Sequence, residues 1–433
     1  MDGHGDRLGT GVAASHVPPL SAVRARTEAY GNLIRASRAR EARDLMFTAW
    51  LPTPTRMERS PWTRRVAAIG LCIAFLVIAG AAISVPWVTR EDRPPVALRT
   101  VDPLTLPVPD PHRNQADPVL KALPPKHGVY LGVSNFHLVS TPGAIAGWTA
   151  ANGARPRIVN WFQQWLTGER RFQPQWARRV ARAGAIPMIT WEPWSAPEGE
   201  KHVAEQPNIS LARIADGHFD PLIRAWARDV AAYRGPLYIR LMHEMNGTWY
   251  PWGVRVNGNT PADYVRAWRH VHRIFDRAGA RNVSWIWSIN NLERIAGESH
   301  DVEAYYPGRK WVDWVSTSGF NWGTAYEWST WRTADALYRD TYEKLSRFGK
   351  PIMISEIGTT GDGGDARVWI RQTFQTLRKD YPQLHAVLWY DDIDGGGLDF
   401  RLQGQTAGAL AQQGTLGSGW LQTPRFRVVA RRP

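Results

Sequence analysis

From residue 126 onward, short apolar segments alternate with longer amphipathic segments. Eight of the apolar segments have the length and the β-branched and aromatic content of strands, and they cover residues 128–136, 157–161, 186–191, 238–244, 283–289, 312–320, 352–356 and 386–390. Helical periodicity falls between them, at residues 175–183, 219–233, 261–278, 333–348 and 365–379. Strands that alternate with helices in this way predict an α/β fold, a (β/α)8 or TIM barrel, for residues 126–433.

A different pattern marks the residues before the barrel. Residues 66–88 contain no charged side chain and are long enough to cross a bilayer, which takes roughly 20 apolar residues. Arginine is frequent before this segment, whereas only Arg90 and Arg93 follow it closely. The positive-inside rule therefore predicts a single-pass signal anchor in the cell membrane, with a largely irregular cytoplasmic segment at 1–65 and the barrel outside. Gly80-Ala81-Ala82 resembles a signal-peptidase site, but a long preceding segment favours a retained anchor.

Composition adds four statements. Residues 89–125 hold nine prolines between positions 94 and 125, which predicts an extended linker between anchor and barrel. The formal net charge of +14 comes mostly from scattered arginines, and no nucleic-acid-binding module is recognisable, so a nucleic-acid partner is not expected. Cys72 is the one cysteine, so an intramolecular disulfide is excluded. The 23 tryptophans exceed what a core requires, and carbohydrate sites are one place that uses them.

Two glutamates follow predicted strands and precede glycine turns. Glu244 ends the fourth strand and Glu356 ends the seventh. The carboxyl ends of barrel strands build the active site, and these two strands lie on opposite sides of its mouth. Glycosidic bond cleavage needs one carboxyl group to protonate the leaving oxygen and another on the far side of the anomeric carbon. The pattern predicts Glu244 as acid/base and Glu356 as nucleophile, against the alternative that either is an ion-pair partner.

Neither a metal nor a cofactor is expected. His243 and Glu244 do not begin an HExxH motif, and no other cluster has metal-ligand spacing. His243 is predicted to orient a carboxylate or contact a sugar hydroxyl, or else to be a hydrogen-bonded wall residue. Asn246 is predicted to be a substrate donor or to hold the turn.

These motifs resemble glycoside hydrolase family 26, a family of retaining barrels. The resemblance rests on HEMNGTWYPW at 243–252, ISEIG at 354–358 and the eight-strand layout, and it covers roughly residues 126–425. It implies the same roles for Glu244 and Glu356, and it implies that Trp389 is the aromatic floor beneath a bound sugar. It also implies β-1,4-mannan as substrate, with β-1,3-xylan and mixed-linkage β-glucan as other family substrates.

The sixth predicted strand departs from the family pattern, which often ends in Asp-Gly-Tyr. Ser318 and Phe320 stand in the places of the Asp and the Tyr. A hydroxyl near the nucleophile would then be missing, and loss of such a hydrogen bond changes the pKa and geometry of a carboxylate. This predicts lowered or altered activity.

Further candidate sugar contacts lie at strand ends. About half of the aromatic ones are expected to line the cleft and the others to pack beneath it. They are Trp161, Trp191, Trp194, Trp249, Trp252 and Trp322. Glu192 is a polar candidate, and Asp391, Asp392 and Asp394 form an acidic cluster that is expected to be a solvated loop.

The sequence thus predicts a membrane-anchored, outward-facing, retaining and endo-acting glycosidase whose substrate is a β-linked polysaccharide. Transglycosylation would use the same residues. A different class of function is a catalytically weak glycan-binding or exopolysaccharide-assembly accessory protein, which the anchor and the sixth-strand departure favour. The retention of both glutamates argues against it.

Overall fold

The computed structural model describes residues 119–195, 204–292, 301–394, 397–402 and 419–429. The predicted cytoplasmic segment, the predicted anchor at 66–88 and most of the predicted linker lie outside these residues. Within the described part of the chain, no helix is both long and apolar enough to cross a membrane.

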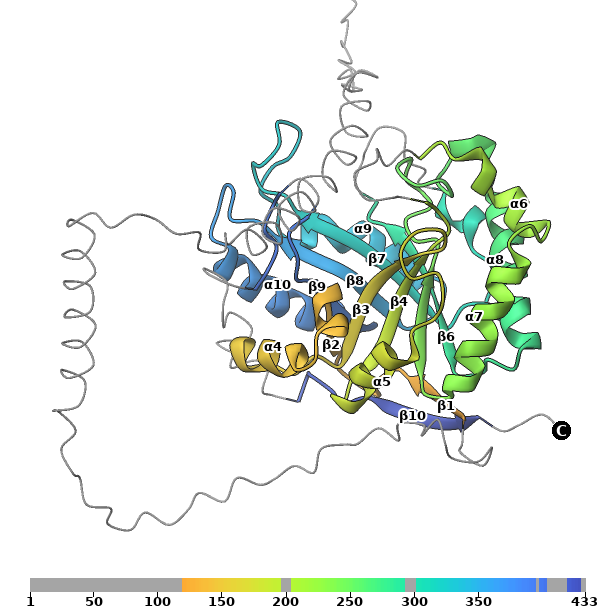
Figure 1. The fold of residues 1–433 in the computed structure, drawn as a ribbon. Coiled ribbons are helices and arrows are strands. Elements are labelled where there is room, and N and C mark those ends of the chain that lie inside the picture. Colours follow the sequence, from red (N-terminus) through yellow and green to blue (C-terminus); the bar gives the residue numbers. More distant parts are fainter. Residues whose placement is uncertain (1–118, 196–203, 293–300, 395–396, 403–418, 430–433) are drawn as a thin grey trace, which may run out of the picture. The chain divides into compact units, whose positions relative to one another are not determined.

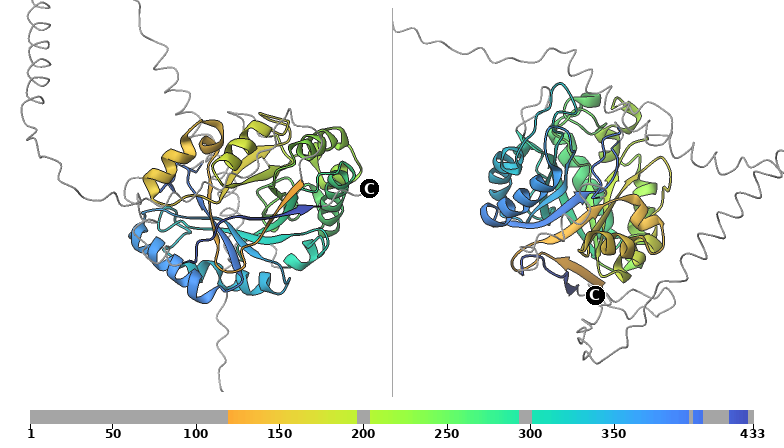
Figure 2. Two further views of the ribbon diagram at one scale, coloured as in Figure 1. Left: turned by 90° about the horizontal axis from the view of Figure 1, so that it is seen from below. Right: turned by 90° about the vertical axis from the view of Figure 1, so that its left-hand side faces the viewer.

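Eight parallel strands form a closed barrel, which confirms the predicted strand count and order (Figure 1, Figure 2). Each strand pairs with its neighbours in sequence, and the first pairs with the last. The strands are β2 (Tyr130–Ser134), β3 (Ile158–Gln164), β4 (Ile186–Glu192), β5 (Leu237–Leu241), β6 (Val283–Asn290), β7 (Trp314–Asn321), β8 (Ile352–Thr359) and β9 (Leu384–Tyr390).

Helices surround the barrel (Figure 2). They are α3 (Phe136–Ser140), α4 (Ala144–Asn152), α5 (Pro174–Arg182), α6 (Leu211–Ala215), α7 (Asp220–Tyr233), α8 (Pro261–Arg277), α9 (Ala334–Ser346) and α10 (Ala366–Asp380), with 3-10 turns η1 (Pro207–Ile209), η2 (Val256–Gly258) and η3 (Val302–Tyr305). Sequence signals fix their starts: Thr260 and Asp263 form a capping box around Pro261 at the start of α8. Asp365 caps α10 by accepting from the amides of Arg367 and Val368.

Alternation along the strands divides the core into two parts. Outward-facing side chains such as Ile239 and Ile354 pack against the helices in one large apolar cluster. Inward-facing side chains fill the lower part of the barrel in a second cluster that includes Tyr238, Trp314 and Met353. Since successive side chains of a strand point to opposite faces, these residues fix which positions further along each strand face inward.

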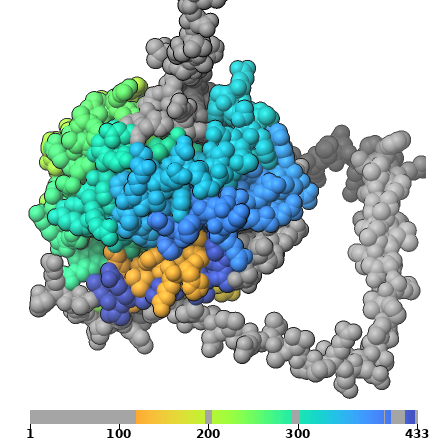
Figure 3. Space-filling view, turned by 180° about the vertical axis from the view of Figure 1, so that it is seen from behind, coloured from red at the N-terminus to blue at the C-terminus, as the bar shows by residue number. Residues whose placement is uncertain are grey.

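The amino end of the barrel is closed by a small antiparallel sheet of β1 (Val119–Leu123) and β10 (Arg425–Val429). In Figure 3 these two segments lie side by side below the helices. The Tyr130 hydroxyl joins both, because it donates to the Leu123 carbonyl (2.9 Å) and accepts from the Arg425 amide (3.0 Å). Ala122 packs into the barrel interior.

This sheet corrects one boundary of the sequence analysis. Residues 119–123 were assigned to the proline-rich linker, but they form a strand whose burial alternates. Leu120 and Ala122 are buried, whereas their neighbours on the strand are only partly buried. Burial of these two side chains favours a strand over an extended linker.

Candidate active site

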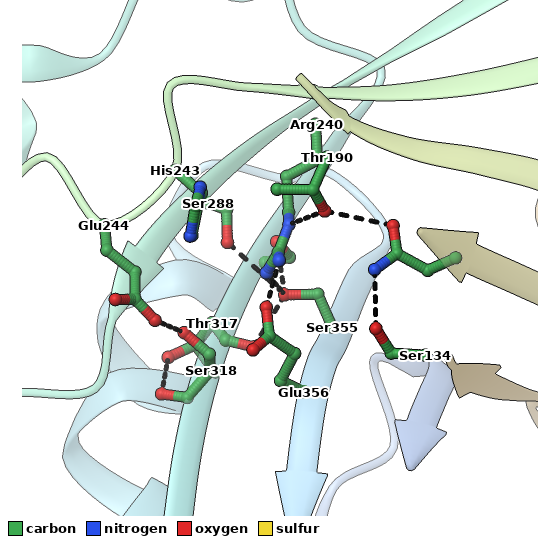
Figure 4. A network of polar contacts seen from close by, with 12 residues as sticks. Ser134, Thr190, Arg240, His243, Glu244, Ser288, Thr317, Ser318, Ser355 and Glu356 are labelled. Carbon is green, nitrogen blue, oxygen red and sulfur yellow. Dashed lines mark hydrogen bonds and ion pairs between the residues drawn. The ribbon is translucent and has the colours of Figure 1, made fainter. Parts of the chain in front are cut away.

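Above the apolar filling of the barrel lies a layer of buried polar side chains, one from nearly every strand. Its members are Ser134, Asn160, Thr190, Arg240, Ser288, Ser316 and Ser355. Figure 4 shows the chain of hydrogen bonds that joins them: Asn160 donates to Ser134 (2.8 Å), Thr190 donates to Asn160 (3.0 Å), and the Arg240 guanidinium donates to Thr190 (2.9 Å). Buried polar groups are costly unless paired, so this layer forms a fixed floor beneath the carboxyl end of the barrel.

A β-bulge in β8 points Glu356 into the barrel. Thr317 and Ser318 of β7 pair with Ile354 and Glu356, so Ser355 is an extra residue on β8. Ile354 and Ile357 both belong to the outer apolar cluster, and therefore both residues between them are free to face inward. Bulges re-aim side chains in this way, often beside active sites.

Glu356 is paired with Arg240 of β5. Both side chains are buried, and the second guanidinium nitrogen of Arg240 donates to Oε1 of Glu356 (Figure 4). The first guanidinium nitrogen donates to Ser355 Oγ (2.8 Å). Burial raises the pKa of Glu356, and the positive charge and hydrogen bond of Arg240 act against that rise. The ion pair therefore favours an ionised Glu356 although its side chain is buried.

Glu244 lies where β5 gives way to a loop. Its backbone φ is +53°, and that of Met242 is +45°. Such conformations are uncommon for residues other than glycine, and they end the strand and direct the carboxyl group toward β7. There Ser318 Oγ donates to Glu244 Oε1, and Trp249 Nε1 donates to Oε2 (2.9 Å).

The electrostatics of Glu244 differ from those of Glu356. Burial, followed by the negative charge of Glu356, raises the pKa of Glu244 to about 7. The hydrogen bonds from Ser318 and Trp249 and the charge of Arg240 oppose the rise. One carboxyl group with a raised pKa beside another whose ionised form is stabilised by a cation is the usual arrangement of an acid and a nucleophile.

Glu192 is a third carboxyl group at the same end of the barrel. It is the last residue of β4, and it is buried. Burial raises its pKa to about 8, while Arg240 lowers the pKa and the charges of Glu356 and Glu244 raise it further. Glu192 thus shares the electrostatic environment of the other two glutamates.

His243 is a neutral wall residue of the site. Burial, followed by the charge of Arg240, lowers its pKa well below the usual range. Its Nε2 hydrogen-bonds the Tyr250 hydroxyl (3.0 Å), whereas among the described residues Nδ1 has no partner. Phe162 contacts the ring edge-on, with centroids 5.9 Å apart.

Three of the tryptophans predicted to contact sugar, Trp191, Trp252 and Trp389, are buried in the barrel wall. Trp191 faces outward from β4 between the rings of Trp165 and Trp226. Trp252 stacks on Tyr250 and donates to the His243 carbonyl (2.6 Å), so it supports the histidine from behind. These rings stabilise the barrel wall, and the prediction of direct sugar contact does not hold for them in this structure.

Trp389 is the third of these, and it does not form the floor that the family resemblance implied. Ala386 and Leu388 belong to the interior cluster, so alternation turns Trp389 outward, where it contacts Trp369 of α10. Tyr390 is instead the inward-facing aromatic residue at the end of β9. The charges of Glu356 and Glu192 contribute to the raised pKa of Tyr390, after burial as the main cause.

Asn246 holds the loop that follows β5 against β6. Its side-chain oxygen accepts from the Asn290 amide (2.8 Å), and its side-chain nitrogen donates to the Asn290 carbonyl (3.2 Å). Both polar atoms are therefore occupied by the backbone of β6, which matches the alternative that Asn246 holds the turn.

Of the six tryptophans named as candidates at strand ends, four are buried and two are partly exposed, which is fewer than the expected half. Trp161 and Trp194 are buried, whereas Trp249 and Trp322 are partly exposed. Phe320 is also partly exposed, and its ring contacts Tyr390 with centroids 5.5 Å apart.

The acidic cluster after β9 has local partners. Asp391 is buried and accepts hydrogen bonds from Trp148 Nε1 (2.7 Å) and the Leu402 amide (2.8 Å), so it is no solvated loop residue. Among the described residues, no group of three or more His, Cys, Asp or Glu side chains is placed to hold a metal ion.

Comparisons with known proteins identify a family for part of the barrel. Residues 189–358, which run from β4 to β8, match the family model of Glycosyl hydrolase family 26. Endoglucanase H of Acetivibrio thermocellus is 31% identical over 293 residues, covering 65% of this chain and 31% of that protein. Beta-1,3-xylanase TXYA of a Vibrio species is 28% identical over 130 residues, covering 29% of this chain and 26% of that protein.

The fold also matches solved structures. A Cellulomonas fimi endo-beta-1,4-mannanase double mutant superposes with a TM-score of 0.53 at 17% identity, covering 68% of this chain and 72% of that one. The chain spans less than a third of the length of the two curated relatives. The family match includes both inward-facing glutamates, and residues 189–358 of this chain form a Glycosyl hydrolase family 26 domain.

Proposed function

We propose that the barrel hydrolyses β-linked glycosidic bonds of a polysaccharide with retention of configuration, with Glu244 as acid/base and Glu356 as nucleophile. The observation that carries this proposal is the contrast between two buried carboxyl groups at one barrel end. Glu356 is held by the Arg240 guanidinium, and the pKa of Glu244 is raised to about 7.

In the first step, a protonated Glu244 donates its proton to the leaving glycosidic oxygen as the ionised Glu356 attacks the anomeric carbon. The C–O bond to the leaving sugar breaks, and a covalent glycosyl ester forms on Glu356. Arg240 and the serine layer hold the attacking carboxylate in place, which reduces the reorganisation that the step requires.

In the second step, Glu244 acts as a base. Once Glu356 is esterified its negative charge is gone, and that charge is the second largest cause of the raised pKa of Glu244. The pKa of Glu244 therefore falls, and the carboxylate can take a proton from the water that attacks the anomeric carbon. The same pair thus changes role without a change of conformation.

Around the reacting sugar, His243 and Glu192 are the proposed polar contacts. The neutral His243 has an Nδ1 atom without a partner among the described residues, and a buried polar atom gains from a hydrogen bond. The raised pKa of Glu192, about 8, supports a protonated carboxyl group that donates to a sugar hydroxyl at neutral pH.

The substrate proposal is a β-linked polysaccharide. The sequence ranked β-mannan first, and one superposed structure is named as a mannanase. The relative at 31% identity is named as an endoglucanase, so β-glucan is tested equally early, followed by β-xylan. We further propose that residues 66–88 anchor the chain in the membrane with the barrel outside, as the apolar segment and the arginine distribution support.

A glycan-binding accessory role is the second candidate. It is favoured by Phe320, which provides no hydroxyl near Glu356. The Arg240 ion pair weakens this argument, since it supplies a positive charge to the carboxylate directly.

The test is to incubate the purified chain with β-mannan, mixed-linkage β-glucan and β-xylan and to measure new reducing ends. Glu244→Ala and Glu356→Ala are assayed beside it. Release by the wild type that is lost in both variants supports the proposal. Binding of a polymer without release by any of the three proteins supports the accessory role instead.

A further inference from the structure

A chain of aromatic rings leads from the catalytic carboxyl groups out to the rim of the barrel. It starts at Tyr390 and Phe320, and Phe320 contacts Trp322 with centroids 5.3 Å apart. Trp322 contacts Tyr326 at 5.8 Å and Trp328 at 6.1 Å. Tyr326 and Trp328 are stacked, with centroids 5.0 Å apart and ring planes 11° apart. We call Phe320, Trp322, Tyr326 and Trp328 the aromatic ramp.

The inner end of the ramp belongs to the active site. Phe320 follows Ser318 by two residues on β7, so both side chains face inward, and Ser318 donates to Glu244. Phe400, which is buried, contacts both Phe320 and Trp322 and supports the rings from below. The ramp is therefore continuous with the site in which Glu244 and Glu356 lie.

The outer end of the ramp is open to solvent. Trp328 is 47% exposed, and Phe136 and Val428 are the other exposed large apolar residues of the described part of the chain. A large exposed ring loses the hydrophobic gain that packing would provide. Exposed aromatic groups that continue a binding site are typical of interaction surfaces.

The loop that carries the ramp is held in one conformation. The side-chain oxygen of Asn321 accepts from the amides of Gly323 (3.3 Å) and Arg332 (2.9 Å), and so ties both ends of the loop together. Gly323 has a φ of +56°, and a Cβ there would lie 1.7 Å from the Asp362 carbonyl oxygen. The turn thus requires glycine, and the rings are pre-organised, which lowers the entropic cost of binding.

A row of flat aromatic rings favours a ligand that has flat apolar faces. The pyranose of a β-linked glycan presents faces of C–H groups, which pack on aromatic rings while its hydroxyl groups stay in water. A single sugar in the catalytic centre would not reach the stacked pair at the rim, because Phe320 and Trp322 lie between. We propose that the aromatic ramp binds the sugar units of a linear β-linked polysaccharide beyond the one that is cleaved, with Tyr326 and Trp328 as its outermost subsite.

This inference rests on the proposed glycosidase function and deepens it, because it selects a polymer over a short glycoside as substrate. The main test distinguishes cleavage at the catalytic glutamates from polymer binding at the rim of the barrel. The full chain and its Trp328→Ala variant are compared on the polymer that the wild type cleaves and on an aryl β-disaccharide of the same sugar. Val428→Ala is the control, since Val428 is exposed on β10 at the opposite end of the barrel.

We expect Trp328→Ala to lower kcat/KM for the polymer about tenfold, the effect of about one aromatic contact. The value for the aryl disaccharide should stay within about twofold, as should both values for Val428→Ala. Equal kcat/KM values of Trp328→Ala and wild type on the polymer would overturn the proposal that the aromatic ramp binds the polymer. Equal losses on both substrates would also overturn it, because they would show a general disturbance of the centre.

Binding distinguishes failure of the ramp from failure of the glycosidase. In Glu356→Gln, which cannot cleave by the proposed route, retardation of the protein in gels that contain β-glucan or β-mannan measures binding alone. Retardation that is lost when Trp328→Ala is added supports the ramp even if the wild type cleaves no polymer. Retardation unchanged by Trp328→Ala, or absent throughout, rejects it.

Discussion

The two ends of the barrel are built from the same eight strands but use them differently. At the amino end, inward-facing positions hold Tyr238, Trp314 and Met353, and the β1–β10 sheet closes the opening. At the carboxyl end, the inward-facing positions hold serines, Arg240 and three buried glutamates. One end satisfies the requirements of packing, whereas the other keeps ionisable groups out of water.

The difference indicates where this molecule gives up stability for chemistry. Buried carboxyl groups are costly, and at the carboxyl end Glu244 also takes a positive φ. At the amino end, the Tyr130 hydroxyl has both a donor and an acceptor as partners. Substitutions at the carboxyl end should therefore change activity, whereas those at the amino end should change stability and leave activity unchanged.

The largest expected effect is that of the two catalytic glutamates. Glu356→Ala removes the attacking atom and should lower kcat by about 10⁴-fold or more, and Glu244→Ala removes the general acid and should lower it by about 10²–10⁴-fold. The unfolding temperature should not fall in Glu244→Ala, which removes a buried carboxyl group, whereas it should fall in Glu356→Ala, which leaves the buried Arg240 without its anion. Steady-state rates and thermal unfolding check this, and wild-type rates in either variant would contradict it.

Next in size is the effect of Arg240. Arg240→Met leaves Glu356 buried without its cation, so kcat should fall about 10²–10³-fold. Stability should also fall, by about 3–5 kcal/mol, since one member of a buried ion pair is left alone.

Arg240→Lys is the matched control for charge. It keeps the positive charge but loses the forked donor geometry that reaches Thr190, Ser355 and Glu356 together. Its kcat should lie between those of the wild type and Arg240→Met. Full activity of Arg240→Met would show that catalysis does not need the ion pair. It would contradict the contrast drawn between the two ends of the barrel.

The closed end gives the opposite expectation. Tyr130→Phe removes the hydroxyl that joins β1 to β10 and should lower the free energy of unfolding by about 1–2 kcal/mol. The kcat value should be unchanged. Thermal unfolding and polymer hydrolysis are measured on the same preparation, and a loss of kcat without a loss of stability would count against the division between the two ends.

The smallest effect concerns the pH dependence. Glu244 must be protonated in the first step, so kcat/KM should fall as pH rises above about 7. The Ser318 hydrogen bond lowers the pKa of Glu244, so Ser318→Ala should raise this pKa and move the alkaline limb to higher pH by about 0.5–1 unit. Ser316→Ala, on the same face of β7, is the control that should leave the limb in place. A limb that moves to lower pH in Ser318→Ala would contradict the assignment.

The sequence predicted the strands well, because each is a short apolar run bounded by turn residues. The predicted fourth strand ended at Glu244, whereas β5 ends at Leu241. The positive φ angles of Met242 and Glu244 end the strand early and account for the difference. Neither residue is a glycine, so the sequence does not indicate this conformation. Strand β1 was missed because its short alternating pattern stands among prolines.

Arg240 could have been found from the sequence. A charged residue inside an otherwise apolar strand, four positions before Glu244, shares its face by the two-residue period. The bulge at Ser355 could not have been found, since it depends on the registers of two neighbouring strands. The same dependence explains Trp389 and Tyr390: both are aromatic, and only the strand register decides which of them faces the site.

The central claim is that Glu356 forms the glycosyl ester and Glu244 transfers the proton. The most direct test adds azide to each alanine variant with an activated aryl β-glycoside and determines the anomer of the glycosyl azide by NMR. In Glu356→Ala, azide takes the place of the missing nucleophile, and the account predicts an inverted, α-linked azide. In Glu244→Ala, azide attacks the glycosyl ester on Glu356, and the account predicts a retained, β-linked azide. The reverse pairing, or hydrolysis at the wild-type rate in Glu356→Ala, would contradict it.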